Sequence, residues 1–469
     1  MKRFEIINQT DIYTNKIFND YINCFPKLKD FFGCRPSFEA LPENNVPRDN
    51  ALIEHLMEYN KKFYCGEKTL NNLLLLKDKT TSIVSTGQQP GPFIGPLYTI
   101  YKTITAVILA DTLTKKTGKK FIPVFWIESS DSNIAGISSF FYINRENKLK
   151  DLNFPLPKEK TGASFSKIAV NLQDINKFIS NIKNDIDGEK KEGIFSHFRD
   201  ILQENTNFVE FFASLMSFLF SKYGLVLIDP QQAVVQKFLK PIFQKEIQNP
   251  SISPSLVKKA CDKLTEEGYI PSLNIFPNST LVFLEENGKR EKLNFYPGHY
   301  KTGKTTYSKE KLLCILEENP GIFSPNVALR PIAQDFLLRS SIYVAGPNET
   351  AYWAQLKELY DFHKISMPMV FPRLGATLIP SLVSELMSSC KLSFFDFNNR
   401  LDKKISLMVR QKPELKIIFN YLFPQQVLQE RRLNILQFLV KYDVKFIDEL
   451  VRVFSSNDKI FGIHYLIYL

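Results

Sequence analysis

The chain has 469 residues, of which 44% are hydrophobic and 23% are charged, as in an ordinary globular protein. This length accommodates two or three domains of usual size. The net charge is +11, but the basic residues are mostly lysines spread along the whole chain, without a zinc-finger, helix-turn-helix or RNA-binding signature. A solvated, lysine-rich surface explains this charge better than nucleic-acid binding does, so we expect no nucleic-acid partner.

The six cysteines are scattered, with no Cys-x-x-Cys pair and no spacing typical of metal ligands. Isolated thiols are typical of proteins from a reducing cytosol. The N-terminal residues lack the apolar segment of a signal peptide, and no apolar stretch has the length of a membrane span. We therefore expect a cytoplasmic protein that binds no membrane, and the sequence identifies no metal.

Residues 1–80 are predicted to be mainly helical, and the first sheet strand is predicted at 81–86, which read TSIVST. A loop with three glycines and three prolines follows, and from Leu97 onward apolar residues recur at helical spacing. Strand, glycine-bearing turn and helix form the first half of a βαβ unit, in which backbone amides approach a polar or anionic ligand. Ordinary turn chemistry is the alternative explanation for the glycines and prolines.

Two further strands are predicted at 121–127 and 224–230, and both end in polar residues. Polar residues at the carboxyl ends of parallel strands face the crevice where open α/β sheets bind ligands. Insertions are expected at about 146–222 and 250–320, with a tight turn at Asn287-Gly288 in the second. The helices predicted in this part of the chain cover 194–223, 233–248 and 255–267.

The last third repeats the first motif. A strand at 341–345 leads into a Gly-Pro turn at 346–350, and a helix follows from 351, with Asn348 as a candidate cap. One more strand is predicted at 369–373. Helices are predicted at 381–412 and 425–442. The whole pattern predicts an α/β sheet with helical additions.

Five motifs stand in a fixed order along the chain. They read TGQQPG at 86–91 with GPLY at 95–98, PVFW at 123–126, LRPIAQD at 329–335, GP at 346–347 with AYWAQL at 351–356, and PR at 372–373. In this order they resemble the cysteine-adding enzymes of bacillithiol biosynthesis, and the closing residues 461–469 resemble the end of that family. Each motif alone is weak, whereas five in register are specific.

The resemblance implies the architecture. It implies a Rossmann-like parallel-sheet core with connecting-peptide insertions over 1–380, a short helical coiled coil over 381–430, and a segment over 431–469 that returns to the core. It also implies a ligase that adds L-cysteine to the amine of glucosaminyl-malate, and a homodimer formed through the C-terminal helices.

The sequence departs from the family pattern after Trp126. Where the family usually shows Glu-Asp-His-Asp, residues 130–133 read SDSN, and only Asp131 remains. The missing imidazole and carboxylates are the side chains best suited to acid–base chemistry or to a divalent cation. The alternative to an active ligase is therefore a catalytically degenerate relative that binds a sugar-malate or a nucleotide.

Amide formation requires an activated carboxylate, normally an acyl-adenylate or acyl-phosphate, so ATP or ADP is the expected nucleotide. Asp131, Arg330 and Asp335 are the candidate catalytic residues. Arg330, expected at a strand end, suits a carboxylate or phosphate, or an ion pair with Asp335; Asp131 suits an ammonium group or a helix cap. The residues expected to bind substrate are Thr86, Gly87, Gln88, Gly91, Trp126, Gln334, Gly346, Glu349, Tyr352 and Arg373.

These assignments require one spatial arrangement. The two Gly-Pro turns near residues 87 and 346 must open into a shared cleft beside Arg330. Turns on opposite sides of the molecule would contradict the hypothesis.

Overall fold

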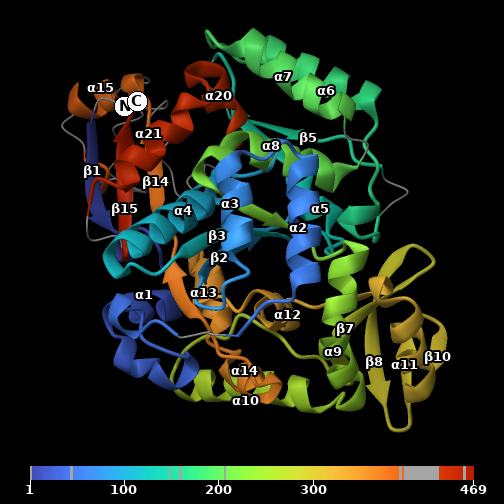
Figure 1. Ribbon diagram of the computed structural model, residues 1–469. Coiled ribbons are helices and arrows are strands. Elements are labelled where there is room, and N and C mark those ends of the chain that lie inside the picture. The colour runs from blue at the N-terminus through green and yellow to red at the C-terminus, as the bar shows by residue number, and fades with distance from the viewer. Residues whose placement is uncertain are drawn as a thin grey trace, which may run out of the picture.

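The core of the protein is a five-stranded parallel sheet with the order β13-β12-β2-β3-β6. Its strands β2 and β3 are labelled near the middle of Figure 1. This sheet confirms the Rossmann-like α/β class. Its strands are β2 (Ser82–Gln88), β3 (Phe121–Ile127), β6 (Val226–Ile228), β12 (Ile342–Ala345) and β13 (Met369–Pro372). The computed structural model describes residues 3–42, 46–146, 149–157, 161–204, 207–389, 393–395, 433–457 and 461–469.

Both faces of the sheet are covered, as a parallel sheet requires. Val84 and Phe125 point to the face covered by α4 (Leu97–Thr117), and the alternate residues Ile83 and Val124 point to the other. On that second face lie α2 (Asn50–Lys62) and α9 (Ala233–Gln248). Because α4 is buried on nearly all sides, its sequence is apolar around most of the helix.

The first insertion is mainly helical, but the prediction of a single helix at 194–223 is wrong. Two helices occupy this stretch, α7 (Lys191–Glu204) and α8 (Phe208–Phe220). The side chain of Asn207 accepts hydrogen bonds from the backbone amides of Val209 and Glu210, so it caps a new helix. The insertion also contains β4 (Ser139–Ile143), β5 (Leu149–Asn153) and α6 (Leu172–Asp185).

Apart from its first helix, the second insertion forms the lobe drawn in yellow at one side of Figure 1. Its antiparallel sheet has the order β10-β9-β8-β7-β11. At the predicted turn, Asn287 and Gly288 have φ of 50° and 73°, which the Asn-Gly sequence tolerates better than any other. The elements are α10 (Ile252–Glu266), β7 (Ser279–Glu286), β8 (Lys289–Tyr296), β9 (His299–Thr302), β10 (Thr305–Tyr307), α11 (Lys309–Glu318) and β11 (Phe323–Pro325).

Two local predictions near the second Gly-Pro turn are wrong. Arg330 does not end a strand but is the second residue of α12 (Leu329–Leu338). Asn348 does not cap α13 (Pro347–Trp353); Gly346 is the N-cap, and its amide donates to the Glu349 carboxylate at 2.8 Å. A carboxylate in the first turn also faces the positive end of the helix, which favours this arrangement. The next helix is α14 (Lys357–His363).

The two ends of the described chain lie side by side (Figure 1). Strand β15 (Ile463–Tyr468) lies between β1 (Arg3–Asn8), to which it is antiparallel, and β14 (Gly375–Ile379), to which it is parallel. Most of the predicted coiled coil, residues 396–430, lies outside the described residues. The remaining helices are α1 (Lys16–Asn23), α3 (Glu67–Leu75), α5 (Ile134–Ile137), α15 (Ser381–Ser389), α20 (Leu436–Tyr442) and α21 (Lys445–Phe454). No helix in the described ranges is long and apolar enough to cross a membrane.

Candidate functional site

A cavity of about 740 Å³ lies at the carboxyl ends of β2, β3 and β12. Gly87 of the first Gly-Pro turn, Gly346 of the second and Arg330 of α12 all line it. The spatial arrangement required by the sequence hypothesis is therefore present. At Gly87, strands β2 and β3 approach each other closely, because a Cβ there would lie 2.7 Å from the carbonyl oxygen of Trp126. A larger residue would push apart the strands that form this edge of the cavity.

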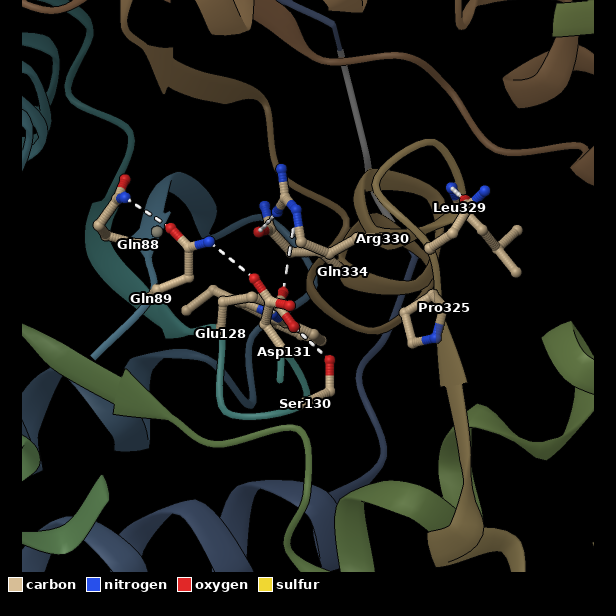
Figure 2. A network of polar contacts seen from close by, with 12 residues as sticks. Gln88, Gln89, Glu128, Ser130, Asp131, Pro325, Leu329, Arg330 and Gln334 are labelled. Carbon is tan, nitrogen blue, oxygen red and sulfur yellow. Dashed lines mark hydrogen bonds and ion pairs between the residues drawn. The ribbon is translucent and has the colours of Figure 1, made fainter. Parts of the chain in front are cut away.

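A chain of polar contacts crosses the cavity wall from the core to the second insertion, and Figure 2 shows its part from Gln88 to Asp131. The Gln88 amide donates to the Gln89 side chain at 2.9 Å, and Gln89 donates to the Asp131 carboxylate at 2.7 Å. Asp131 lies in the loop after β3, and its carboxylate is 3.6 Å from the guanidinium of Arg290 on β8. The insertion thus contributes a buried cation to a site built mainly by the parallel sheet.

Arg330 is the centre of a second network in the cavity lining. Its guanidinium donates to the Gln334 side chain at 3.0 Å and to the Tyr352 hydroxyl at 2.8 Å. The Tyr343 hydroxyl is 3.4 Å away, and the Glu128 carboxylate is 3.9 Å from its Nε. These partners hold the planar guanidinium in one orientation, which is the condition for recognising a carboxylate or phosphate through two parallel hydrogen bonds.

Lys102 connects the two Gly-Pro turns. Its side chain is only 1% exposed, and the ammonium donates to the Gly87 carbonyl and lies 2.7 Å from the Glu349 carboxylate. Glu349 also accepts a hydrogen bond from the Tyr343 hydroxyl at 2.9 Å. Burial opposes ionisation of Glu349, but the Lys102 ammonium outweighs it and holds the pKa of Glu349 below its ordinary value. The pair therefore fixes the relative position of both turns.

Glu128 is a carboxylate of this cavity that lies outside the altered motif at 130–133. It follows β3 directly, and Figure 2 shows it between Ser130 and Arg330. The Ser130 hydroxyl donates to one of its oxygens, and the Trp126 indole donates to the other at 3.2 Å. Burial raises the pKa of Glu128, and the Arg330 guanidinium opposes this shift in part. A serine at position 130 thus accompanies a carboxylate two residues earlier.

Four of the predicted residues lie outside the cavity lining: Thr86, Gly91, Gln334 and Asp335. Thr86 donates to the Val344 carbonyl inside the sheet at 3.0 Å, and Gln334 supports Arg330. Gly91 permits a close turn, since a Cβ there would meet the Gly95 Cα at 2.7 Å. The predicted residues that do line the cavity are Gly87, Gln88, Trp126, Asp131, Arg330, Gly346, Glu349, Tyr352 and Arg373.

Asp335 is fully buried on α12, and the Tyr360 hydroxyl donates to its carboxylate at 2.6 Å. Its predicted ion pair with Arg330 is replaced by the contact of Arg330 with Glu128. Asp335 therefore has a structural role inside the fold and does not reach the cavity, although the sequence identified it as a catalytic candidate. The physical reason is helical geometry, which directs the two side chains of α12 into different environments.

Substitution of Asp335 by asparagine separates these roles. Burial raises the pKa of Asp335 from 3.8 to about 6. The folded state therefore favours the protonated acid, and this stabilisation is present below pH 3.8 and lost as the pH rises through 6. At pH 7.5 we expect Asp335→Asn to raise the free energy of unfolding by up to about 3 kcal/mol, since one pKa unit is worth about 1.4 kcal/mol. Urea unfolding at pH 3.5, 5 and 7.5 measures the difference, which should vanish at the lowest pH.

The same variant is expected to keep the activity of the protein within a few-fold. A stable Asp335→Asn variant that loses activity would restore the catalytic assignment, and equal stability at every pH would contradict the structural one.

Sequence reasoning missed Lys102, Glu128 and Arg290. A signal existed for Lys102, because it is the single charged residue between Leu97 and Ala110, and a charge in a buried stretch of helix must find a partner. A weaker signal existed for Glu128, which belongs to the polar run after the second strand. Arg290 lies in a surface hairpin without a motif, and only the fold brings it to the cavity. In the described part of the chain, no three His, Cys, Asp or Glu side chains gather as metal ligands would.

Two family models match the chain. Residues 1–374 match "Bacillithiol biosynthesis BshC, N-terminal Rossmann-like domain", and residues 415–468 match "Bacillithiol biosynthesis BshC, C-terminal coiled-coil domain". A similar protein of Desulforamulus reducens is 31% identical over 87% of this chain and 78% of its own length. Relatives from Salinibacter ruber and Bacillus cereus strain G9842 are 30% and 29% identical, over 87% and 85% of this chain and 76% and 75% of their own lengths. All three carry the name "Putative cysteine ligase BshC".

Proposed function

Because this chain belongs to the bacillithiol biosynthesis BshC family, we propose that it is a ligase that joins the carboxyl group of L-cysteine to the amine of glucosaminyl-malate. The product of this carbon–nitrogen bond formation is bacillithiol. The observation that carries the proposal is the shared cavity, which brings both Gly-Pro turns, three arginines and the acidic loop after β3 together. Such a ligase must bind the negatively charged and the positively charged groups of its substrates so that the reacting atoms meet.

The charged residues of the cavity suit the charged groups of the substrates. Arg330 and Arg373 both line it and suit the two carboxylates of the malyl group, because guanidinium groups bind carboxylates through paired hydrogen bonds. Arg373 is held by the Leu374 carbonyl at 3.0 Å and the Tyr13 hydroxyl at 3.2 Å. Asp131 suits the ammonium group of cysteine, and the Gln88 amide suits a sugar hydroxyl.

Activation of the cysteine carboxylate is assigned to ATP, through an acyl-adenylate or an acyl-phosphate. The chain supplies cations for the phosphate groups but no metal ligand set among its described residues. Its own residues therefore act by binding and orienting both reactants and by charge stabilisation, which are the main contributions to such transfers. A cytoplasmic location and a homodimer through the C-terminal helices remain part of this proposal.

A degenerate, ligand-binding relative is the second candidate that the altered residues 130–133 suggested. The structure favours the active ligase, because Glu128 provides the cavity with a carboxylate although residue 130 is a serine. The acid–base capacity that the motif lacks is therefore available from a neighbouring position.

An assay with purified protein tests the function directly. Incubation with glucosaminyl-malate, L-cysteine and ATP is expected to yield a product with the mass of bacillithiol, together with one equivalent of ADP or AMP. Omitting ATP should leave the substrates unchanged. A complete absence of product with any nucleotide, with or without divalent cations, would rule out the ligase.

A further inference from the structure

Three carboxylates among the described residues line the cavity. They differ in how many of their hydrogen-bond acceptor positions are already occupied by neighbouring residues. Glu349 pairs with Lys102 and accepts from the Tyr343 hydroxyl and the Gly346 amide. A carboxylate offers about four acceptor positions. Glu349 therefore has little capacity left for a ligand, and its negative charge is already neutralised.

Asp131 is engaged in a similar way. One of its oxygens accepts from the Ser132 amide at 2.7 Å and lies 3.6 Å from the Arg290 guanidinium, and the other accepts from Gln89 at 2.7 Å. These contacts hold its side chain between the core and the second insertion. It suits the binding of a fixed positive charge better than the transfer of a proton.

Glu128 is engaged least. Each of its oxygens accepts one hydrogen bond, from the Ser130 hydroxyl and from the Trp126 indole. The Arg330 guanidinium is 3.9 Å away, which is an electrostatic contact but not a hydrogen bond. Acceptor positions therefore remain on both oxygens of a carboxylate that lines the cavity and is 13% exposed.

We propose that Glu128 is a catalytic residue that binds the attacking amine of the sugar substrate and accepts its proton as the amide forms. This inference rests on the proposed function. The amine nitrogen bonds to the carbonyl carbon of the activated cysteine, and the C–O bond to the phosphate or AMP leaving group breaks. The leaving group keeps the electron pair of that bond, and the proton that the nitrogen loses passes to the Glu128 carboxylate.

The surroundings of Glu128 agree with this role. The charged groups that face it are Arg330 from α12, Asp131 from its own loop and Arg290 from β8. Burial and Asp131 raise its pKa, whereas the two arginines and the Ser130 hydroxyl lower it, and the net shift is upward. A carboxylate with a raised pKa is a stronger base and is matched more closely to a general base working near neutral pH.

Binding measurements test the inference without requiring turnover. Calorimetry compares glucosaminyl-malate with its N-acetyl form, whose nitrogen carries no basic lone pair. We expect the protein to bind the free amine at least about 10-fold more tightly, as is typical for one hydrogen bond to a charged group. In Glu128→Gln this ratio should fall to about 1, whereas in Glu317→Gln, which alters an exposed glutamate of α11, it should stay unchanged.

The outcomes separate the two proposals. If the unaltered protein binds the free amine preferentially and Glu128→Gln keeps that preference, the role of Glu128 is excluded and the proposed ligase stands. If the unaltered protein binds neither compound, the substrate assignment fails and this inference fails with it.

A pH profile gives a second, kinetic readout. A reaction that needs a general base slows as the pH falls through the pKa of that base. Because the pKa of Glu128 is raised, kcat should decrease on the acidic side at a pH above the ordinary pKa of a glutamate. Glu128→Gln should lower kcat by about 100-fold or more and remove this acidic limb. Glu128→Asp should keep the limb at a reduced rate. A Glu128→Gln enzyme with the limb intact would overturn the proposal.

Discussion

Replacement of Lys102 by methionine is expected to lower the free energy of unfolding by about 3–5 kcal/mol, the cost of breaking a buried ion pair by removing one partner. Methionine fills a similar volume but leaves the Glu349 carboxylate without its counter-ion. It also leaves the Gly87 carbonyl without the donor that it now has. Because both Gly-Pro turns lose their common anchor, we expect ligase activity to fall more steeply than stability does. Urea unfolding and the product assay measure the two effects.

An exposed pair provides the matched control. Lys62 lies 2.6 Å from Glu210, but its side chain is 54% exposed. Water screens this pair, so Lys62→Met should change the free energy of unfolding by less than about 1 kcal/mol. Equal losses in the two variants would contradict the role that we assign to Lys102. A double variant, Lys102→Met with Glu349→Gln, should recover part of the stability, because no unpaired charge remains.

The loss of unfolding free energy caused by Lys102→Met should also depend on pH. The lowered pKa of Glu349 means that its ionised form stabilises the protein above the unfolded pKa, and that this contribution is lost as the pH falls through the folded pKa. Without Lys102, the Glu349 carboxylate binds its proton at a higher pH. The difference between the two proteins should therefore be largest near neutral pH and should shrink as the pH approaches 4.5, the ordinary value for this group.

Replacement of Arg330 by lysine is expected to lower kcat/KM for glucosaminyl-malate by about 100-fold, although the positive charge is kept. The guanidinium holds Gln334 and Tyr352 while it faces the cavity, and a single ammonium cannot reproduce that planar set of donors. One or two lost hydrogen bonds to a charged group are worth about 1.5–3 kcal/mol each, which corresponds to this factor. Most of the loss should appear in KM, if Arg330 binds the malyl carboxylates.

Arg452→Lys serves as the control for this substitution. Arg452 lies on α21 in an exposed pair with Glu449, outside the cavity lining. Its replacement should leave kcat/KM unchanged. An Arg330→Lys enzyme with full activity and unchanged KM would show that the substrate carboxylates bind elsewhere.

The sequence predicted those parts of the fold that follow from local patterns. The β-branched run at 81–86, the apolar run at 121–127 and the Asn287-Gly288 turn each occupy the predicted element. The sequence-based prediction failed where a single residue ends or begins an element. At Asn207, the side chain caps a new helix inside a continuous apolar pattern. The prediction also failed at Arg330, because the run around it has the composition of a strand end but forms the first turn of a helix.

By itself, the sequence determined the Rossmann-like class, the two Gly-Pro turns and nine of the residues that line the cavity, because strand, turn and helix signals lie within a few residues of one another. Only the tertiary structure decided which side chains meet. Lys102 joins turns separated by about 260 positions, and Arg290 reaches Asp131 from an inserted hairpin. The engagement of each carboxylate depends on such distant partners, so the free acceptor positions of Glu128 could be recognised only after the chain had folded.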